Sequence, residues 1–149
     1  MNVGDMCSRA VVSISAYEPV QQAAELMRRY QVGTLVVTQP ASGGDEPIGV
    51  ITDRDIVIGV VAKHVEPDTL TAGDVMSAEP LIAEEHDDVN DVLDDMRREG
   101  VRRIPVVDQA GTLVGVFALD DLLQILATQL NLVAGIVGSQ RTEERRKRA

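Results

Sequence analysis

The sequence predicts an α/β (α+β) protein built from two copies of a β-α-β-β-α unit. An internal repeat is the first observation: adding 69 to the residue number places Val20 on Val89, and adding 66 places Gly49 on Gly115. The second is that each copy joins a stretch of helical apolar periodicity to short runs rich in Val and Ile, which favour strands. One copy is too small to bury both its helix face and its sheet face. We therefore expect the two copies to pack together with approximate two-fold symmetry.

The first copy is placed at residues 5–63. It is predicted to hold an entry strand, an amphipathic helix, two further strands and a closing helix, at 11–14, 20–30, 35–38, 48–51 and 53–63. Pro19 suits the first turn of the amphipathic helix, because the fixed backbone angle of proline matches the helix. Residues 39–47 are rich in Gly, Pro and Ser and are predicted to form a loop. Residues 64–74, with Pro67, are expected to link the copies.

The second copy, placed at residues 75–137, repeats this order at 81–83, 89–99, 104–107, 113–117 and 120–137. Asp87 or Asp88 can cap its amphipathic helix. The closing helix carries apolar residues on more than one face, which indicates burial on several sides. A partner subunit is the expected cover, so we expect a homodimer. Residues 138–149 turn polar and basic and are expected to form a disordered tail, with an anion-binding tail as the alternative.

Composition limits the classes of partner. The chain has 149 residues, of which 44% are hydrophobic and 2% aromatic, and its net charge is −10. An acidic surface repels nucleic acid and anionic membranes, so we expect neither as a partner. The single Cys7 excludes an internal disulfide and fits a reducing compartment. No run of 18 apolar residues and no N-terminal signal pattern appears, so we expect a cytoplasmic protein.

Thr52 and Asp55 mark a strand-to-helix junction that follows the apolar run 48–51. Each side chain can accept a hydrogen bond from an unpaired backbone N–H of the first helical turn. A helix N-terminus also carries free N–H donors and partial positive charge, which suit a phosphate or a ribose. The pair is therefore either a helix cap only or part of a ligand site.

The marks of the two copies resemble a tandem pair of CBS domains, the repeats first named from cystathionine β-synthase. They are Gly49-Val50-Ile51-Thr52-Asp53-Arg54-Asp55 in the first copy, and Val75-Met76-Ser77-x-x-Pro80, Val101 to Asp108 and Gly115-Val116-Phe117 in the second. The resemblance covers about Asp5 to Val137. It implies two CBS repeats packed with pseudo-two-fold symmetry, a disc-like dimer of such pairs, and adenine-containing ligands bound in clefts between the repeats.

The resemblance also implies which residues bind. In the family a Thr or Ser, two further residues and an Asp hold phosphate and ribose, and this motif maps onto Thr52 and Asp55, with Arg54 beside them. The segment ahead of a hydrophobic–Pro pair lines the adenine pocket and sends basic side chains toward the phosphates. That segment maps onto Val101, Arg102, Arg103, Ile104 and Pro105.

The two copies are unequal. The second copy has Ala118 where the first has Thr52, although Asp121 remains, and the first copy has Thr34 where the second has Arg103. The hydroxyl-bearing motif and the arginines could serve one site across the two-fold axis. A second site around Asp121 is expected to be degraded, and either empty or weakly occupied.

These features favour a stand-alone regulatory module that senses an adenine nucleotide and signals to an unknown protein. AMP, ADP and ATP are the expected ligands, and NAD and S-adenosylmethionine share the same adenosine. One alternative is a dimerisation scaffold that has lost ligand binding. The other is a hydrolase or transferase, against which the absence of a nucleophile–base pair argues. We expect no enzyme, and no metal site at His86 or His64, which lack metal-ligand spacing.

Overall fold

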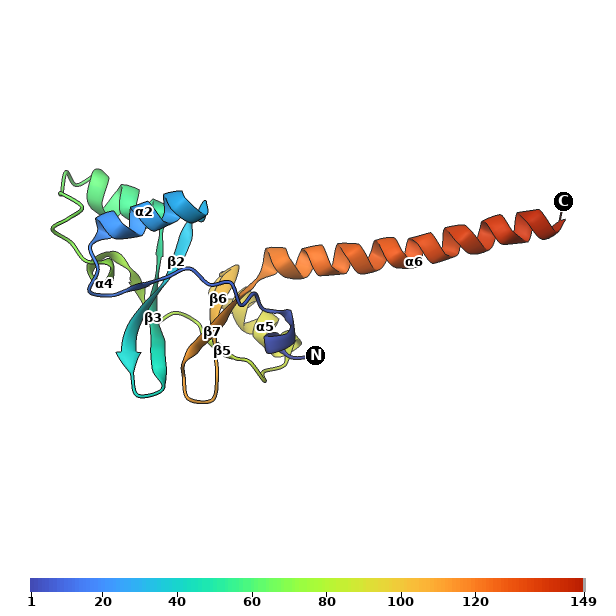
Figure 1. Ribbon diagram of the computed structural model, residues 1–149, viewed down its shortest axis with the longest axis horizontal. Coiled ribbons are helices and arrows are strands. Elements are labelled where there is room, and N and C mark those ends of the chain that lie inside the picture. The colour runs from blue at the N-terminus through green and yellow to red at the C-terminus, as the bar shows by residue number, and fades with distance from the viewer. Residues whose placement is uncertain (149) are drawn as a thin grey trace.

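Two small β-sheets form the body of the protein, and one long helix extends away from it (Figure 1). The structure is a computed structural model that describes residues 1–148. The first sheet has the order β1-β2-β3-β4, and its strands are Ser13–Ser15, Thr34–Ala41, Gly44–Thr52 and Ser77–Ala78. The second sheet has the order β5-β6-β7, and its strands are Ala83–Glu84, Arg103–Val107 and Leu113–Ala118.

The two sheets repeat one topology, as the sequence predicts. In each, a short entry strand runs parallel to the first strand of an antiparallel hairpin, so β1 pairs with β2 and β5 pairs with β6. A register shift interrupts each hairpin at the same place, between Val37 and Thr38 in one and between Val106 and Val107 in the other. The α/β fold and its internal repeat are therefore confirmed.

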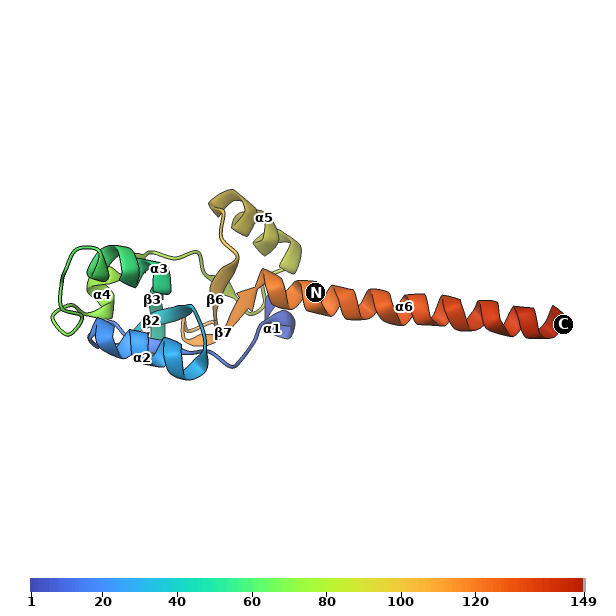
Figure 2. The same cartoon turned by 90° about the horizontal axis from the view of Figure 1, so that it is seen from above.

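The helices of the body cover these sheets, and Figure 2 shows α2 and α5 on separate sides of it. The elements are α1 Val3–Met6, α2 Val20–Tyr30, α3 Asp53–Ile56, the π-helix η1 Val57–Val61, α4 Ala72–Val75 and α5 Val89–Glu99. The bounds of α2 and α5 equal the predicted ranges, because strong amphipathic periodicity fixes both helices. Asp88 is the N-cap of α5, where its carboxylate accepts from the Asn90 N–H at 2.9 Å.

Each repeat completes its core with a segment that lies far away in the sequence. Val3 of α1 is fully buried in the second core beside Phe117, and Ser8 exchanges two backbone hydrogen bonds with Val116. Conversely, Ala72 of α4 is fully buried in the first core, and β4 pairs with β3. The linear division into 5–63 and 75–137 therefore does not coincide with the two packing units.

Two local predictions are wrong. The loop predicted at 39–47 is mostly strand, because β2 and β3 continue to a tight turn at Ser42 and Gly43. The tail predicted to be disordered from residue 138 is helical: α6 spans Leu119–Arg148 without a break. Its sequence lacks proline and continues in Arg, Glu, Lys and Gln, which favour helix, and charges of both signs lie one turn apart.

The long helix α6 is also much more exposed than predicted. Leu122 is its one buried residue among those described, and the other large apolar side chains from Leu123 to Val137, except the half-buried Ile125, face solvent in the single chain. By length and composition alone, α6 is long and apolar enough to cross a membrane, and 6% of its most apolar window is buried. Most of the apolar length of α6 is therefore uncovered within the described residues 1–148.

Candidate ligand-binding site

A cleft of about 610 Å³ between the two repeats brings most of the predicted site residues together. Thr52 and Asp55 come from the end of β3 and the start of α3, whereas Arg102 and Arg103 lead into β6 of the other repeat. The lining residues are Thr34, Val50, Thr52, Asp55, Ser77, Pro80, Leu81, Val101, Arg102, Arg103, Ile104 and Asp120. The hydroxyl-bearing motif and the arginines thus share one cavity across the pseudo-two-fold axis.

Thr52 and Asp55 form a complete capping box at the start of α3. The Asp55 N–H donates to Thr52 Oγ1 at 3.1 Å, and the Thr52 N–H donates to Asp55 Oδ2 at 2.9 Å. These hydrogen bonds hold both side chains in fixed orientations at the edge of the cleft. Each carboxylate and hydroxyl oxygen can still accept further hydrogen bonds, so capping and ligand binding are compatible.

Asp120, in the first turn of α6, pairs with both arginines of the cleft. Arg102 Nη2 donates to Asp120 Oδ1 at 2.6 Å, and Arg103 Nη2 lies 3.6 Å from Asp120 Oδ2. The Leu119 N–H also donates to the Arg102 carbonyl at 2.9 Å. The start of α6 is therefore tied to the basic side of the cleft through both backbone and side chain.

The cleft combines an apolar wall with a charged rim. Val101, Ile104, Pro80 and Leu81 offer aliphatic surface on which a planar base could lie. Opposite charges balance at the rim, where two arginines face the carboxylates of Asp55 and Asp120. An anionic ligand would exchange the contact with Asp120 for its own contacts with the arginines, whose planar guanidinium groups suit phosphate oxygens.

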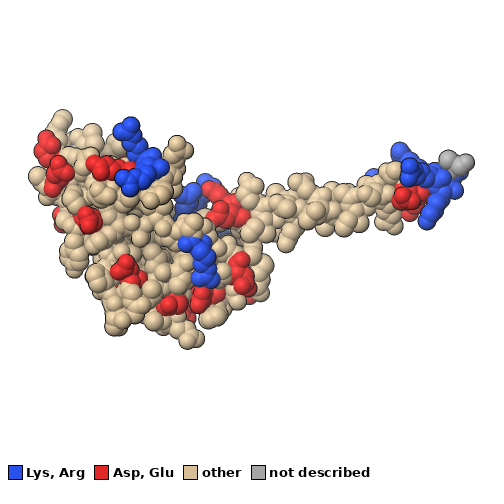
Figure 3. Space-filling model, viewed as in Figure 1, with Lys and Arg blue, Asp and Glu red and all other residues tan. Residues whose placement is uncertain are grey.

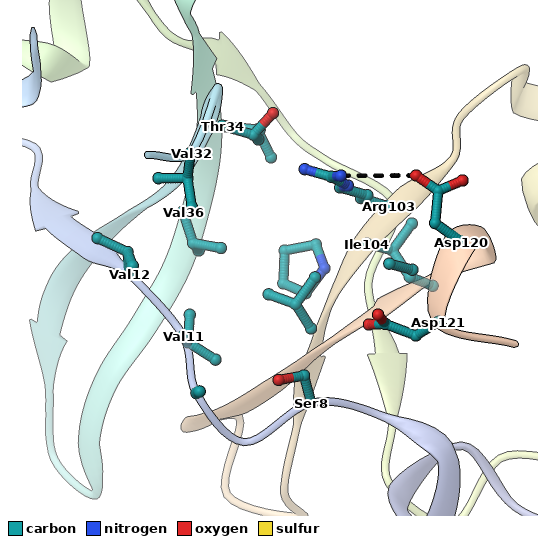
Figure 4. Close-up of a pocket in the computed structure, with 15 residues that line it drawn as sticks. Ser8, Val11, Val12, Val32, Thr34, Val36, Arg103, Ile104, Asp120 and Asp121 are labelled. Carbon is teal, nitrogen blue, oxygen red and sulfur yellow. Dashed lines mark ion pairs between the residues drawn. The ribbon is translucent and has the colours of Figure 1, made fainter. Parts of the chain in front are cut away.

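A second cavity of about 240 Å³ lies on the other side of Arg103 and Ile104 (Figure 4). Pro105 and Asp121 line this cavity and not the first one. Figure 4 shows Arg103 and Asp120 at one end, joined by their ion pair, with Asp121 nearer to Ser8. One arginine faces two aspartates, and Ala118 offers no hydroxyl, so this cavity is poorly suited to a phosphate.

Arg54 lies apart from both of these cavities. It lines a third hollow, of about 500 Å³, beside α3 and η1, together with Lys63 and Asp74. The residue related to Arg54 by the 66-residue shift is Asp120, which does line the main cleft. Arg54 was predicted to act beside Thr52 and Asp55, but its counterpart in the second repeat, the acidic Asp120, is the residue of this pair that lines the cleft.

Several residues that line the cleft were not among the predicted site residues. Asp120 carries no motif of its own, and the 66-residue shift was the signal that could have found it. Thr34 was available as the counterpart of Arg103 under the 69-residue shift. Val50, Ser77, Pro80 and Leu81 belong to, or directly follow, the segments that carried the resemblance, and that position is the signal that marks them.

The remaining candidate groups contribute little to this site. Partial burial raises the pKa of the Cys7 thiol, which keeps it protonated and weakly nucleophilic at neutral pH. Within residues 1–148, no group of three or more His, Cys, Asp or Glu side chains is placed to hold a metal ion.

Comparison with known proteins gives one consistent result. The CBS domain model matches residues 3–61 and again 72–128. A protein from Methanopyrus kandleri is 38% identical over 125 residues, which are 84% of this chain and 62% of that one. The hypoxic response protein 1 of Mycobacterium tuberculosis is 31% identical over 123 residues, 82% of each chain.

Among solved structures, a CBS domain protein from Pyrobaculum aerophilum complexed with AMP is similar, with 28% identity and a TM-score of 0.70. The match covers 86% of this chain and 99% of that one. The two matches to the domain model together span most of the chain, and each contains one of the two β-hairpins, β2-β3 and β6-β7. Because sequence, repeat and topology agree, the chain belongs to the CBS domain family.

Proposed function

We propose that this protein is a regulatory module that binds an adenine nucleotide, of the AMP, ADP or ATP type, in the cleft between its repeats. One observation carries the proposal: Thr52 and Asp55 of the first repeat line the same cavity as Arg102 and Arg103 of the second. Hydroxyl, carboxylate and helix N–H groups suit ribose and phosphate, and the arginines supply the positive charge that an anion requires. The AMP complex of the related P. aerophilum protein supports the choice of ligand class.

The signal would leave the cleft through α6. A phosphate that engages Arg102 and Arg103 competes with Asp120, and Asp120 stands at the first turn of the exposed helix. Ligand binding would therefore change how the start of α6 is held, and a regulated protein or a second copy could sense that change. On this proposal the chain is a homodimer in the cytoplasm and is not an enzyme.

Thermal unfolding with a ligand panel tests the proposal. A ligand that binds only the folded state raises the melting temperature by mass action. We expect AMP, ADP or ATP to raise it, with adenosine giving a smaller shift and GMP serving as the control for the base. NAD and S-adenosylmethionine complete the panel. If no adenine compound shifts the transition, the dimerisation scaffold is the better account, and conversion of a bound nucleotide to products would show an enzyme.

A further inference from the structure

Helix α6 exposes a row of apolar side chains that no part of its own chain covers in the described structure. Leu123, Leu126, Leu130, Val133 and Val137 have exposed fractions between 44% and 71%. Figure 3 shows the corresponding length of helix free of charge, with acidic residues where it leaves the body and basic residues near its end. Large contiguous apolar surfaces of this kind mark an interaction site.

The spacing of these residues is that of a coiled coil. Together with Leu119 they follow steps of four, three, four, three and four residues, so six successive a and d positions of a heptad are apolar. We call this row the seam and define it as Leu119, Leu123, Leu126, Leu130, Val133 and Val137. We propose that α6 pairs through the seam with the same helix of a second copy of this chain, in antiparallel orientation.

A polar stripe on the opposite side of α6 argues for a helical partner and against a lipid environment. Gln124 and Asn131 occupy the b positions of the same heptad and Thr128 an f position, on the side away from the seam, where Ile125 and Leu132 at the c positions are apolar. A membrane-spanning helix is apolar all round, whereas a helix of a coiled coil keeps one side in water. The length of α6 would suit a membrane, but the polar side chains in its middle turns suit a second helix.

Charge supports an identical partner in antiparallel orientation. Asp120 and Asp121 begin α6, and Arg145, Arg146, Lys147 and Arg148 end it. A parallel pair would bring like charges together at both ends, whereas an antiparallel pair carries each basic end past the start of the other helix toward the acidic body of the partner, where residues 1–118 contain 20 Asp and Glu and 9 Lys and Arg. The helix dipoles favour the same orientation.

The seam is complementary to itself in this orientation. With Leu126 opposite the partner's Leu130, Leu123 lies opposite the partner's Val133, and Leu119 lies opposite the partner's Val137. Each a position then meets a d position, and larger Leu side chains oppose smaller Val side chains at both ends. The two folded bodies stand at opposite ends of the helix pair, so a disc-like contact between bodies would be a separate interface.

Two neighbouring substitutions test the proposal by sedimentation of the full chain. Leu130→Lys places a charge in the seam, and Asn131→Lys places the same charge on the polar stripe one residue away. We expect the parent and Asn131→Lys to be dimers at micromolar concentration. Leu130→Lys should weaken the pair by about 100-fold or more, which corresponds to about 2.7 kcal/mol. Equal helical circular dichroism for both variants would show that the helix itself persists.

Other outcomes would overturn the proposal. A parent chain that is monomeric at these concentrations contradicts it directly. If the parent floats with phosphatidylcholine and phosphatidylglycerol vesicles and both lysine variants lose flotation equally, α6 is a membrane segment, since the two positions differ little in depth. In a Cys7→Ser background, mixed Leu126→Cys and Leu130→Cys chains should crosslink with each other. Preferential crosslinking of Leu130→Cys with itself would contradict the antiparallel orientation.

Discussion

Asp120, in the first turn of α6, accepts a hydrogen bond of 2.6 Å from the side chain of Arg102, the residue before Arg103. The same carboxylate lies 3.6 Å from a guanidinium nitrogen of Arg103. The two arginines available to a phosphate therefore already have an anionic partner, and that partner belongs to the helix that leaves the body. This contact links occupancy of the cleft to the position of α6.

Removing this competitor should strengthen nucleotide binding. We expect Asp120→Asn to raise the affinity for AMP by about two- to five-fold, because exposed ion pairs contribute about 0.2–1 kcal/mol each. Adenosine should bind as before, since it carries no phosphate. Titration calorimetry measures both affinities, with Asp121→Asn as the matched control that removes an equal charge one residue further along. Weaker binding of AMP by Asp120→Asn would mean that Asp120 orients the arginines instead of competing for them.

Arg103 should recognise the phosphate. Arg103→Ala is expected to weaken nucleotide binding by about 1.5–3 kcal/mol, the range for hydrogen bonds to charged groups. The loss for adenosine should be much smaller. Arg97→Ala provides a control, because Arg97 lies on the exposed side of α5 and pairs with Asp94 outside the cleft. Equal losses for nucleotide and nucleoside would show that Arg103 acts on the base or on the fold.

The role of Thr52 can be separated from helix capping because the chain contains a second capping box. Thr71 and Asp74 cap α4 with the same pair of hydrogen bonds, and Thr71 does not line the cleft. Aspartate caps a helix about as well as threonine, so Thr52→Asp and Thr71→Asp should both melt normally without ligand. Only Thr52→Asp should lose nucleotide-induced stabilisation, because it places a carboxylate against the phosphate.

Thr52→Ser keeps the hydroxyl and should keep both stability and binding. Melting curves with and without AMP give all of these results. If Thr52→Asp is stabilised by AMP as strongly as the parent, Thr52 is a helix cap only, and the nucleotide site has to be sought in the second cavity.

The two cavities should differ in affinity. Asp55→Ala is expected to abolish most nucleotide binding, whereas Asp121→Ala, in the cavity that has one arginine and two aspartates, should matter less. Asp74→Ala controls for the loss of a capping carboxylate, since Asp74 has the same capping geometry outside the main cleft. Calorimetry that finds two equal sites, equally weakened by either Asp55→Ala or Asp121→Ala, would contradict the asymmetry.

The N-terminal segment of the chain packs on the second sheet and leaves little room for a side chain at Gly115. A Cβ atom there would lie 2.8 Å from Cys7 Sγ and 2.8 Å from the Ser8 carbonyl oxygen. We expect Gly115→Ala to lower the free energy of unfolding by about 1–3 kcal/mol, as overpacking does. Gly135→Ala, in an open part of α6, should be neutral or stabilising. Urea denaturation compares the two, and an equally stable Gly115→Ala would show that residues 7–8 do not pack on the second sheet.

The sequence alone determined the features that depend on local patterns. Apolar periodicity set the bounds of α2 and α5, because a helix that buries one face must repeat its apolar residues at fixed steps. The internal repeat predicted that Thr52 and Asp55 would meet Arg102 and Arg103, since two copies with unequal motifs form a mixed site when they pack across an axis. The identity of the family followed from the same marks.

Tertiary structure decided the features that depend on which distant segments meet. No periodicity shows that Val3 completes the second core or that Ala72 completes the first, because short apolar segments fit either core until the chain is folded. Asp120 has no motif, and it acts on the cleft only because the start of α6 lies against the strand that follows Arg102. The sequence signalled an apolar helix from residue 120 to 137, but only the fold shows that the body buries Leu122 and leaves the seam open from Leu123 onward, because the helix leaves the body after its first turns.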